Sequence, residues 1–345
     1  DTPAYLKLRK QRYLCRHCGR TFTLKTSLVN QHCFISNNVK MAIMNEAARE
    51  VQPEKRIAQK YSVFASTVNQ LLFSLYEWKR PNYRYLPKHL CFDEFKSVQS
   101  AKGAMSFLFC DAATGDIIDI VEDRRLRTFK DYFSRYPLSV RKKVQSIVID
   151  MYSPYIQLIR EMFPKASIVT DRFRVIQLIG RAFNKTRIKV MNADKAHYTK
   201  LKRYWKLFWK PRLELDDQNY RWSPCYRKLM SEWAIVNDLV DCSSELFDTY
   251  EVYQTLLYPM KNNDKKQLER TLATWEEEHP QVSNYMKTAI KTMKKYLPYL
   301  TNMLESEYTN GVIEGIINKI KLIKRVSYGY RSYLHLKNRI MMLHG

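Results

Sequence analysis

The sequence lacks any uninterrupted apolar run of the about 18–20 residues that a membrane-spanning helix needs, and no secretory signal opens it. A membrane-integral protein is therefore excluded. Cysteine is scarce: there are seven, an odd number, and apart from Cys15 and Cys18 they are scattered. This usage fits a reducing cytoplasm better than a disulfide scaffold.

Acidic residues are also few, with 34 Asp and Glu against 59 Lys and Arg, which leaves a net charge of +25. Such an excess predicts a polyanionic partner, most simply nucleic acid, with an anionic membrane surface as the alternative. The 345 residues can form more than one domain. The chain begins with Asp1 rather than Met, within a polar and basic pattern, as a fragment or processed protein does.

A short β-branched run, Val144–Ile149, ends in Asp150 and predicts a buried strand. A helical pattern over 151–164 and a second apolar run, Ala166–Thr170, follow, and Asp171 ends that run. Strand–helix–strand order predicts parallel strands, so both acids are expected at the carboxyl edge, where α/β proteins collect catalytic groups. Helix capping is the other interpretation of an Asp at a strand end.

An earlier apolar stretch, Leu90–Phe95, carries Asp93, and the segments 105–110 and 117–121 predict an antiparallel hairpin with glycine at its turn. A helix over 127–136 then leads to the Val144 strand. This order predicts a ribonuclease-H-like α/β core in which the strands of Asp93 and Asp150 are neighbours. Two adjacent carboxylates repel each other, and Mg²⁺ or Mn²⁺ relieves that repulsion.

The N-terminal region contains Cys15-x-x-Cys18-Gly19, which is typical of one zinc-ribbon knuckle. The second knuckle is absent downstream, and His17, His32 and Cys33 lack a convincing ligand spacing. A knuckle preceding Asp1 explains the pattern equally well, so zinc is expected in the intact N-terminus and not as a complete site here.

Residues 39–76 predict helices over 39–51, 55–61 and 65–76, the last two arranged like a helix-turn-helix. Val68, Leu71 and Leu72 are expected to face the core. A plain helical hairpin is the alternative, and the basic excess over residues 1–90 favours DNA binding. The residues expected to contact DNA here are Arg56, Ser66, Thr67, Asn69 and Gln70.

Residues 185–305 show no strand pattern and predict an all-helical insertion. Its Trp and Tyr residues among lysines could stack on bases, but ordinary core packing is preferred for most of them. Further on, Glu314 opens a predicted helix, and no acid follows it before the chain ends. It could point to metal ions or simply favour a helix N-terminus. The basic residues expected to follow the DNA backbone are Lys319, Lys321, Lys324, Arg325 and Arg331.

Together these stretches resemble the DDE transposases of bacterial insertion sequences, in the ISL-three group. The similarity rests on the knuckle, the helix-turn-helix, and four motifs: Phe92-Asp93-Glu94-Phe95, Ile149-Asp150-Met151, Thr170-Asp171-Arg172-Phe173 and Thr309-Asn310-Gly311-x-x-Glu314-Gly315-x-x-Asn318. It implies that Asp93, Asp150 and Glu314 form a metal-binding catalytic triad for DNA cleavage and strand transfer. It also implies recognition of terminal inverted repeats, binding of target DNA, and a homodimer or larger assembly on DNA.

The chain departs from the family in two places. Members usually carry D-x-F-H-V where this chain has Asp171-Arg172-Phe173-Arg174-Val175, so Asp171 and Arg174 are candidate accessory residues. The first zinc knuckle is also missing. The rival interpretations are a catalytically inactive or domesticated transposase-derived DNA-binding protein, and a ribonuclease-H-like nuclease that does not transpose.

The expected organisation divides the chain into six segments. They are a zinc-ribbon-like segment (1–36), a helix-turn-helix (37–80), a linker (81–89), the first part of the core (90–184), the helical insertion (185–305) and the C-terminal Glu helix with its basic tail (306–345).

Overall fold

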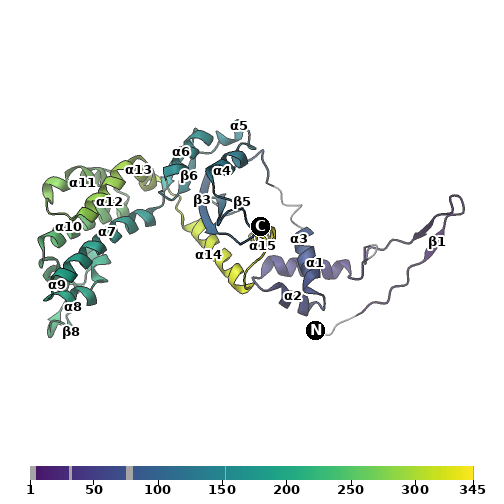
Figure 1. Ribbon diagram of the computed structural model, residues 1–345, viewed down its shortest axis with the longest axis horizontal. Coiled ribbons are helices and arrows are strands. Elements are labelled where there is room, and N and C mark those ends of the chain that lie inside the picture. The colour runs from purple at the N-terminus through teal and green to yellow at the C-terminus, as the bar shows by residue number, and fades with distance from the viewer. Residues whose placement is uncertain (1–4, 31–32, 75–80, 152, 345) are drawn as a thin grey trace. The chain divides into compact units, whose positions relative to one another are not determined.

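The computed structural model describes residues 5–30, 33–74, 81–151 and 153–344. They form two compact units, one made of residues 1–143 with 311–345 and the other of residues 144–310 (Figure 1). His32 and residues 75–80 lie outside the described residues, and with them the predicted end of the third helix.

The first unit combines two ends of the chain. Its elements are β1 (Arg12–Leu14), β2 (Thr21–Thr23), α1 (Asn37–Arg49), α2 (Glu54–Lys60), α3 (Ala65–Ser74), β3 (His89–Lys96), β4 (Met105–Asp111), β5 (Ile117–Val121), α4 (Leu126–Phe133), α5 (Leu138–Arg141), α14 (Gly311–Val326) and α15 (Tyr333–Leu343).

Helices α1, α2 and α3 pack around a small apolar core. Val68 and Leu72 are buried there and Leu71 is partly buried, as their helical spacing predicts. Met342 of α15 joins the same core, so the C-terminal helix completes the three-helix cluster. A short turn joins α2 to α3, and Ser62 in it has a φ of 51°.

Strands β4 and β5 form the predicted antiparallel hairpin, and β3 extends it to a meander by pairing antiparallel with β4. Leu90 pairs with Asp111 and Lys96 with Met105, so the whole length of β3 lies against β4. Gly115 closes the β4–β5 turn with a φ of +80°, a conformation that side-chain-bearing residues rarely adopt. Phe92, Phe107 and Phe133 lie among the clustered aromatic rings that fill the space between this sheet and α4.

The second unit begins with the predicted strand–helix–strand. Its elements are β6 (Ser146–Ile149), α6 (Ser153–Met162), β7 (Ser167–Thr170), α7 (Arg172–Ala193), α8 (Tyr198–Arg203), η2 (Leu207–Trp209), η3 (Arg212–Glu214), β8 (Arg221–Ser223), β9 (Lys228–Met230), α9 (Glu232–Val240), α10 (Ser244–Asn262), α11 (Lys265–Glu278), α12 (Asn284–Lys295) and α13 (Leu297–Glu305). Strands β6 and β7 are parallel, which confirms the prediction from their order.

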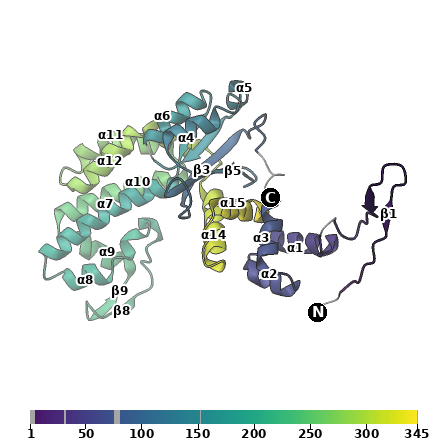
Figure 2. The same cartoon turned by 45° about the vertical axis from the view of Figure 1, so that its right-hand side comes forward.

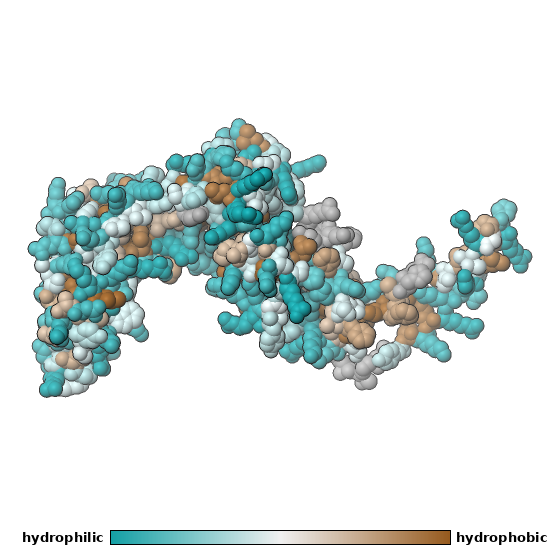
Figure 3. Space-filling view, viewed as in Figure 1, coloured by the Kyte–Doolittle hydropathy of each residue, from teal (hydrophilic) through white to brown (hydrophobic). Residues whose placement is uncertain are grey.

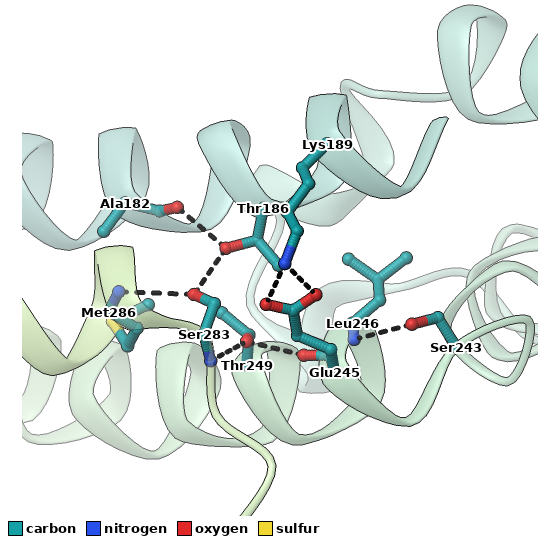
Figure 4. A network of polar contacts seen from close by, with 9 residues as sticks. All are labelled: Ala182, Thr186, Lys189, Ser243, Glu245, Leu246, Thr249, Ser283 and Met286. Carbon is teal, nitrogen blue, oxygen red and sulfur yellow. Dashed lines mark hydrogen bonds and ion pairs between the residues drawn. The ribbon is translucent and has the colours of Figure 1, made fainter. Parts of the chain in front are cut away.

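Helix α7 packs against α10 and α12 (Figure 2). Buried hydroxyl groups connect the three helices (Figure 4). The hydroxyl of Thr186 on α7 donates to Ser283 Oγ at 2.6 Å, and the Ser283 backbone N–H donates to Thr249 Oγ1 at 3.1 Å. All three residues are buried. Because unpaired buried hydroxyls are costly, this network favours one arrangement of the three helices.

Two features of the second unit correct the sequence-based expectation. The insertion is not all-helical, because β8 and β9 form an antiparallel hairpin. Each strand has three residues, too few to show a period, and the cross-strand pair Trp222 and Leu229 is exposed. Helix α7 also continues across residues 184 and 185, so the expected core–insertion boundary falls inside a helix.

Among the described residues, no helix is both long and apolar enough to cross a membrane. Hydrophilic residues cover much of the face shown in Figure 3, with smaller hydrophobic patches between them.

Candidate functional site

Asp150 and Asp171 follow the two parallel strands of the second unit, at their carboxyl ends. The Asp171 backbone N–H donates to Ile149 O at 3.0 Å, which extends the β6–β7 ladder to these acids. Asp171 is buried and caps α7, because its Oδ1 accepts the Phe173 N–H at 3.0 Å. Asp150 is more accessible, with 36% of its side chain exposed. The capping interpretation therefore fits Asp171, whereas the Asp150 side chain stays partly exposed at the strand end.

Arg174, on the first turn of α7, contacts both acids. Its Nε donates to Asp150 Oδ1 at 3.1 Å and lies 4.0 Å from Asp171 Oδ2. The guanidinium thus occupies one oxygen of the Asp150 carboxylate. Because Arg174 is 45% exposed and Asp150 36% exposed, this ion pair contributes at most about 1 kcal/mol. A divalent cation can displace a contact of that strength.

Asp93 and Glu314 belong to the first unit, on β3 and α14, which pack together. Asp93 is partly buried in the middle of β3, and its Oδ1 accepts the Glu94 N–H at 2.7 Å. Glu314 lies on the exposed side of α14, opposite a buried isoleucine stripe (Ile313, Ile316, Ile317, Ile320 and Ile323). The apolar period of the helix thus leaves its acid accessible.

Two contacts fix the direction of α14 along β3. Lys324 donates to the carbonyls of Lys96, at 2.8 Å, and Ser97, at 3.1 Å, where β3 ends. At the other end, Val312 packs against Gly115, in the turn beside the start of β3. Helix and strand therefore run in the same direction.

Because α14 and β3 run in the same direction, the position of each acid can be counted from the contact that Lys324 makes at the end of β3. Glu314 precedes Lys324 by about 15 Å of helix, and Asp93 precedes Lys96 by about 10 Å of strand. Counted from the Lys324 contact, the two acids are level to within about one helical turn.

The N-terminal strands β1 and β2 are joined by the Cys-x-x-Cys turn. Gly19 has a φ of +65°, and its N–H donates to Cys15 O at 2.9 Å. The backbone N–H groups of Cys18 and His17 lower the pKa of the Cys15 thiol, which favours the thiolate that binds metal. Within the described part of the chain, which leaves out His32, no third His, Cys or acid completes a ligand group with this pair.

The predicted DNA-contacting residues of α2 and α3 differ in exposure. Arg56, Ser66 and Gln70 are exposed, and Thr67 is partly exposed. The Asn69 side chain already has a partner inside the protein, because its amide donates to the Glu54 carboxylate at 3.0 Å. Asn69 and Gln70 line a shallow pocket together with Phe73, Ser74 and His335.

The basic residues near the end of the chain fall into two groups. Lys321, Arg325 and Arg331 are exposed. Lys319 and Lys324 instead donate to backbone carbonyls, Lys319 to Leu343 O at 2.5 Å. These two ammonium groups therefore tie α14 to its neighbours, a role that their charge alone does not indicate.

Two curated relatives match this chain. The "Transposase for insertion sequence element IS1001" of Bordetella parapertussis is 24% identical over 259 residues, which cover 73% of this chain and 60% of that protein. An "ATP-dependent protease" of Lactococcus lactis subsp. lactis is 35% identical over 116 residues, 34% of this chain and 36% of that protein. The chain thus spans less than two thirds of either relative, and the second match is too short to transfer an activity.

A family model described as "Transposase" matches residues 90–340, nearly three quarters of the chain. The matched range contains β3 with Asp93, the β6–β7 edge with Asp150, the whole insertion and α14 with Glu314. The match does not favour the alternative of a transposase-derived DNA-binding protein without activity. This chain belongs to the DDE transposases of the ISL-three group.

Proposed function

We propose that this chain acts in transposition: it binds the terminal inverted repeats of an insertion sequence and carries out metal-dependent DNA cleavage and strand transfer. The family match supports the reaction class. The main structural support for the proposed site is the partly exposed Asp150 carboxylate at the carboxyl end of β6. Asp93 and Glu314, level with each other along β3 and α14, supply the other two carboxylates of the proposed triad.

Mg²⁺, or Mn²⁺ in its place, is the proposed cofactor. Carboxylate oxygens are the donors that these hard ions prefer, so Asp93, Asp150 and Glu314 fit them. The ions supply Lewis acidity, which activates the attacking oxygen and stabilises the leaving oxygen of an in-line displacement. The three residues would hold the ions. Arg174 places a positive charge beside the Asp150 carboxylate, with which those ions would compete.

Helices α2 and α3 are the proposed DNA-reading element. In this proposal the polar residues of α3 contact base edges, while Arg56 and the exposed Lys321, Arg325 and Arg331 contact phosphate. Zinc held by Cys15 and Cys18, together with ligands beyond these two, is proposed for the intact N-terminus. Joining two element ends requires at least two protomers on DNA.

The experiment that tests this function separates cleavage from binding. Asp150→Asn keeps the size of the side chain and removes its charge. We expect cleavage of a terminal-repeat duplex in Mg²⁺ to fall at least about a hundredfold, while the dissociation constant for that duplex changes less than threefold. Asp131→Asn, at an exposed position of α4, serves as the matched control. Unchanged cleavage by the Asp150 variant, or equal loss of cleavage and binding, contradicts the proposal.

A further inference from the structure

Three residues with metal-binding side chains meet in the second unit, away from the β6–β7 edge. Asp194 is the C-cap of α7, His197 precedes α8, and Cys242 lies just beyond α9. One donor atom from each side chain lies within 4.8 Å of the other two. All three residues are partly buried, so an ion can reach the donors without opening the core. Chain folding brings Cys242 to a pair that lies 45 or more residues before it.

The first two donors are held by a turn. Asp194 Oδ1 accepts the backbone N–H groups of Ala196, at 2.9 Å, and His197, at 3.1 Å. Its other oxygen, Oδ2, lies 2.6 Å from His197 Nδ1. The carboxylate and the imidazole are therefore preorganised, which lowers the entropic cost of binding an ion.

The simplest alternative is a turn cap with a cysteine beside it. A cap needs only the Asp194 oxygens and the backbone N–H groups, and it does not require a thiol from a distant segment of the chain. Burial, and then the negative charges of Asp194, Asp238 and Asp241, raise the pKa of the Cys242 thiol. Lys200 lies 3.7 Å from Asp238 and offsets that charge, and the other two carboxylates attract a cation.

The donor set selects the ion. Carboxylate oxygen, imidazole nitrogen and thiolate sulfur together suit Zn²⁺, whose bonds of about 2.0–2.3 Å imply tetrahedral edges of roughly 3.3–3.8 Å. The Asp194–His197 contact, now 2.6 Å, therefore opens by roughly 1 Å, and the other donor pairs, which lie no more than 4.8 Å apart, close by at most about 1.5 Å. Three protein ligands leave the fourth position to water.

We propose that Asp194, His197 and Cys242 form a zinc site that joins the α7–α8 turn to the end of α9. On binding, the Cys242 thiol loses its proton to solvent, and the ring proton of His197 moves from Nδ1 to Nε2 through solvent. The ion then replaces the hydrogen bond between Oδ2 and Nδ1, and water completes the shell. The ion cross-links segments that are distant in sequence, so it stabilises the helical insertion. The site is distinct from the proposed triad and independent of DNA.

The test uses the full chain with Cys15→Ser and Cys18→Ser, which removes the other proposed zinc ligands. Co²⁺ is the probe because a thiolate ligand gives it a charge-transfer absorption band. We expect one equivalent of Co²⁺ to bind with that band, and Zn²⁺ to displace it. Adding Cys242→Ser or His197→Gln should abolish the band, whereas adding Cys225→Ser, a partly buried cysteine outside the group, should preserve it.

A second measurement guards against a variant that merely unfolds. Zn²⁺ should raise the thermal midpoint of the parent by several degrees and leave that of the Cys242→Ser derivative unchanged, both having the same far-UV circular dichroism spectrum. Absence of Co²⁺ binding in the parent overturns the proposal, and so does a band that survives Cys242→Ser. Neither readout involves DNA, so the result does not depend on the transposition chemistry.

Discussion

Arg174 shows how a single residue alters the charge at the proposed active site. It stands where the family motif usually has histidine, and its guanidinium binds the Asp150 carboxylate at 3.1 Å. Arginine remains protonated at all physiological pH values, whereas a histidine is largely neutral at pH 7. In this chain a divalent cation must therefore compete with a fixed positive charge for one oxygen of Asp150.

We predict that Arg174→His raises the affinity for Mn²⁺ up to about fivefold, since an exposed ion pair is worth at most about 1 kcal/mol. Titration of the DNA-free chain with Mn²⁺ measures the change. Arg172→His is the control, because Arg172 bonds Asn263 rather than Asp150. Equal Mn²⁺ affinity in the Arg174 variant and the unmodified chain would show that the guanidinium does not compete with the ion.

Glu46 links α1 to α2 through a partly buried carboxylate. Burial opposes its ionisation, but hydrogen bonds from Lys60, Tyr61 and Gln52 outweigh that effect and lower the pKa of Glu46. The pKa in the folded state is therefore below the unfolded value of about 4.3. The stabilising contribution is complete above that pH and is lost as the pH falls through the lowered folded-state pKa.

Glu46→Gln should accordingly lower the thermal midpoint at pH 7, and the difference from the unmodified chain should shrink on acidification below about pH 4. Scanning calorimetry at several pH values tests this. Glu50→Gln, at an exposed position, is expected to have little effect. A destabilisation by Glu46→Gln that stays constant down to pH 3 would rule out the ionic explanation.

At the scale of elements, the insertion relies on polar as well as apolar contacts between its helices. The hydroxyl oxygen of Thr186 also lies 3.2 Å from Ala182 O, and Ser283 Oγ accepts the Met286 N–H at 3.3 Å (Figure 4). Ser283 is thus both the N-cap of α12 and the partner of α7. Lys189 and Glu245 add an ion pair between α7 and α10 at 2.8 Å.

Thr186→Val keeps the shape of the side chain and removes its hydroxyl. We expect the free energy of unfolding to fall by about 1–3 kcal/mol, because the buried Ser283 hydroxyl loses its partner on α7. Urea unfolding followed by circular dichroism measures this loss. Thr288→Val is the matched control, since Thr288 is exposed and bonds only within its own helix, to Asn284 O at 2.8 Å. Similar losses for the two variants would mean that the network contributes nothing specific.

At the scale of the whole molecule, α15 unites distant parts of the first unit. Arg339 is buried and donates to the carbonyls of Ala47, Glu50 and Gln52, around the end of α1. On the side of the sheet, Tyr333 donates to Ile120 O at 2.8 Å, and Lys337 forms a buried ion pair with Asp119. The C-terminal helix therefore holds the proposed DNA-reading helices against the meander that carries Asp93.

Arg339→Lys keeps the charge but cannot reach three carbonyls at once. We predict faster amide hydrogen exchange across α1 and a weaker affinity for DNA, even though Arg339 is buried and cannot contact DNA itself. Exchange measured by mass spectrometry checks the first effect and a mobility-shift titration the second. The control Arg331→Lys, at an exposed position, should leave exchange in α1 unchanged. If exchange across α1 is the same in both variants, α15 does not support the helical cluster.

Local sequence determined much of this protein. The β-branched run before Asp150, the glycine turn of the β4–β5 hairpin and the apolar periods of α3 and α14 each predict the observed element, because period and turn chemistry act over a few residues. The family motifs likewise identified the family, which the match over residues 90–340 confirms. The hairpin β8–β9 escaped prediction because three-residue strands carry too little pattern.

Only the tertiary structure decided which side chains meet. From the sequence, Arg174 cannot be distinguished from a surface cation, but α7 places it against Asp150. Lys324 and Arg339 belong to a basic tail in the sequence, yet folding aims both at backbone carbonyls. The Asp-x-x-His spacing of residues 194 and 197 is visible in the sequence, but Cys242 joins that pair only through the packing of separate helices. The chemistry of a side chain follows from its own residue, whereas its partners depend on contacts between residues that are far apart in the sequence.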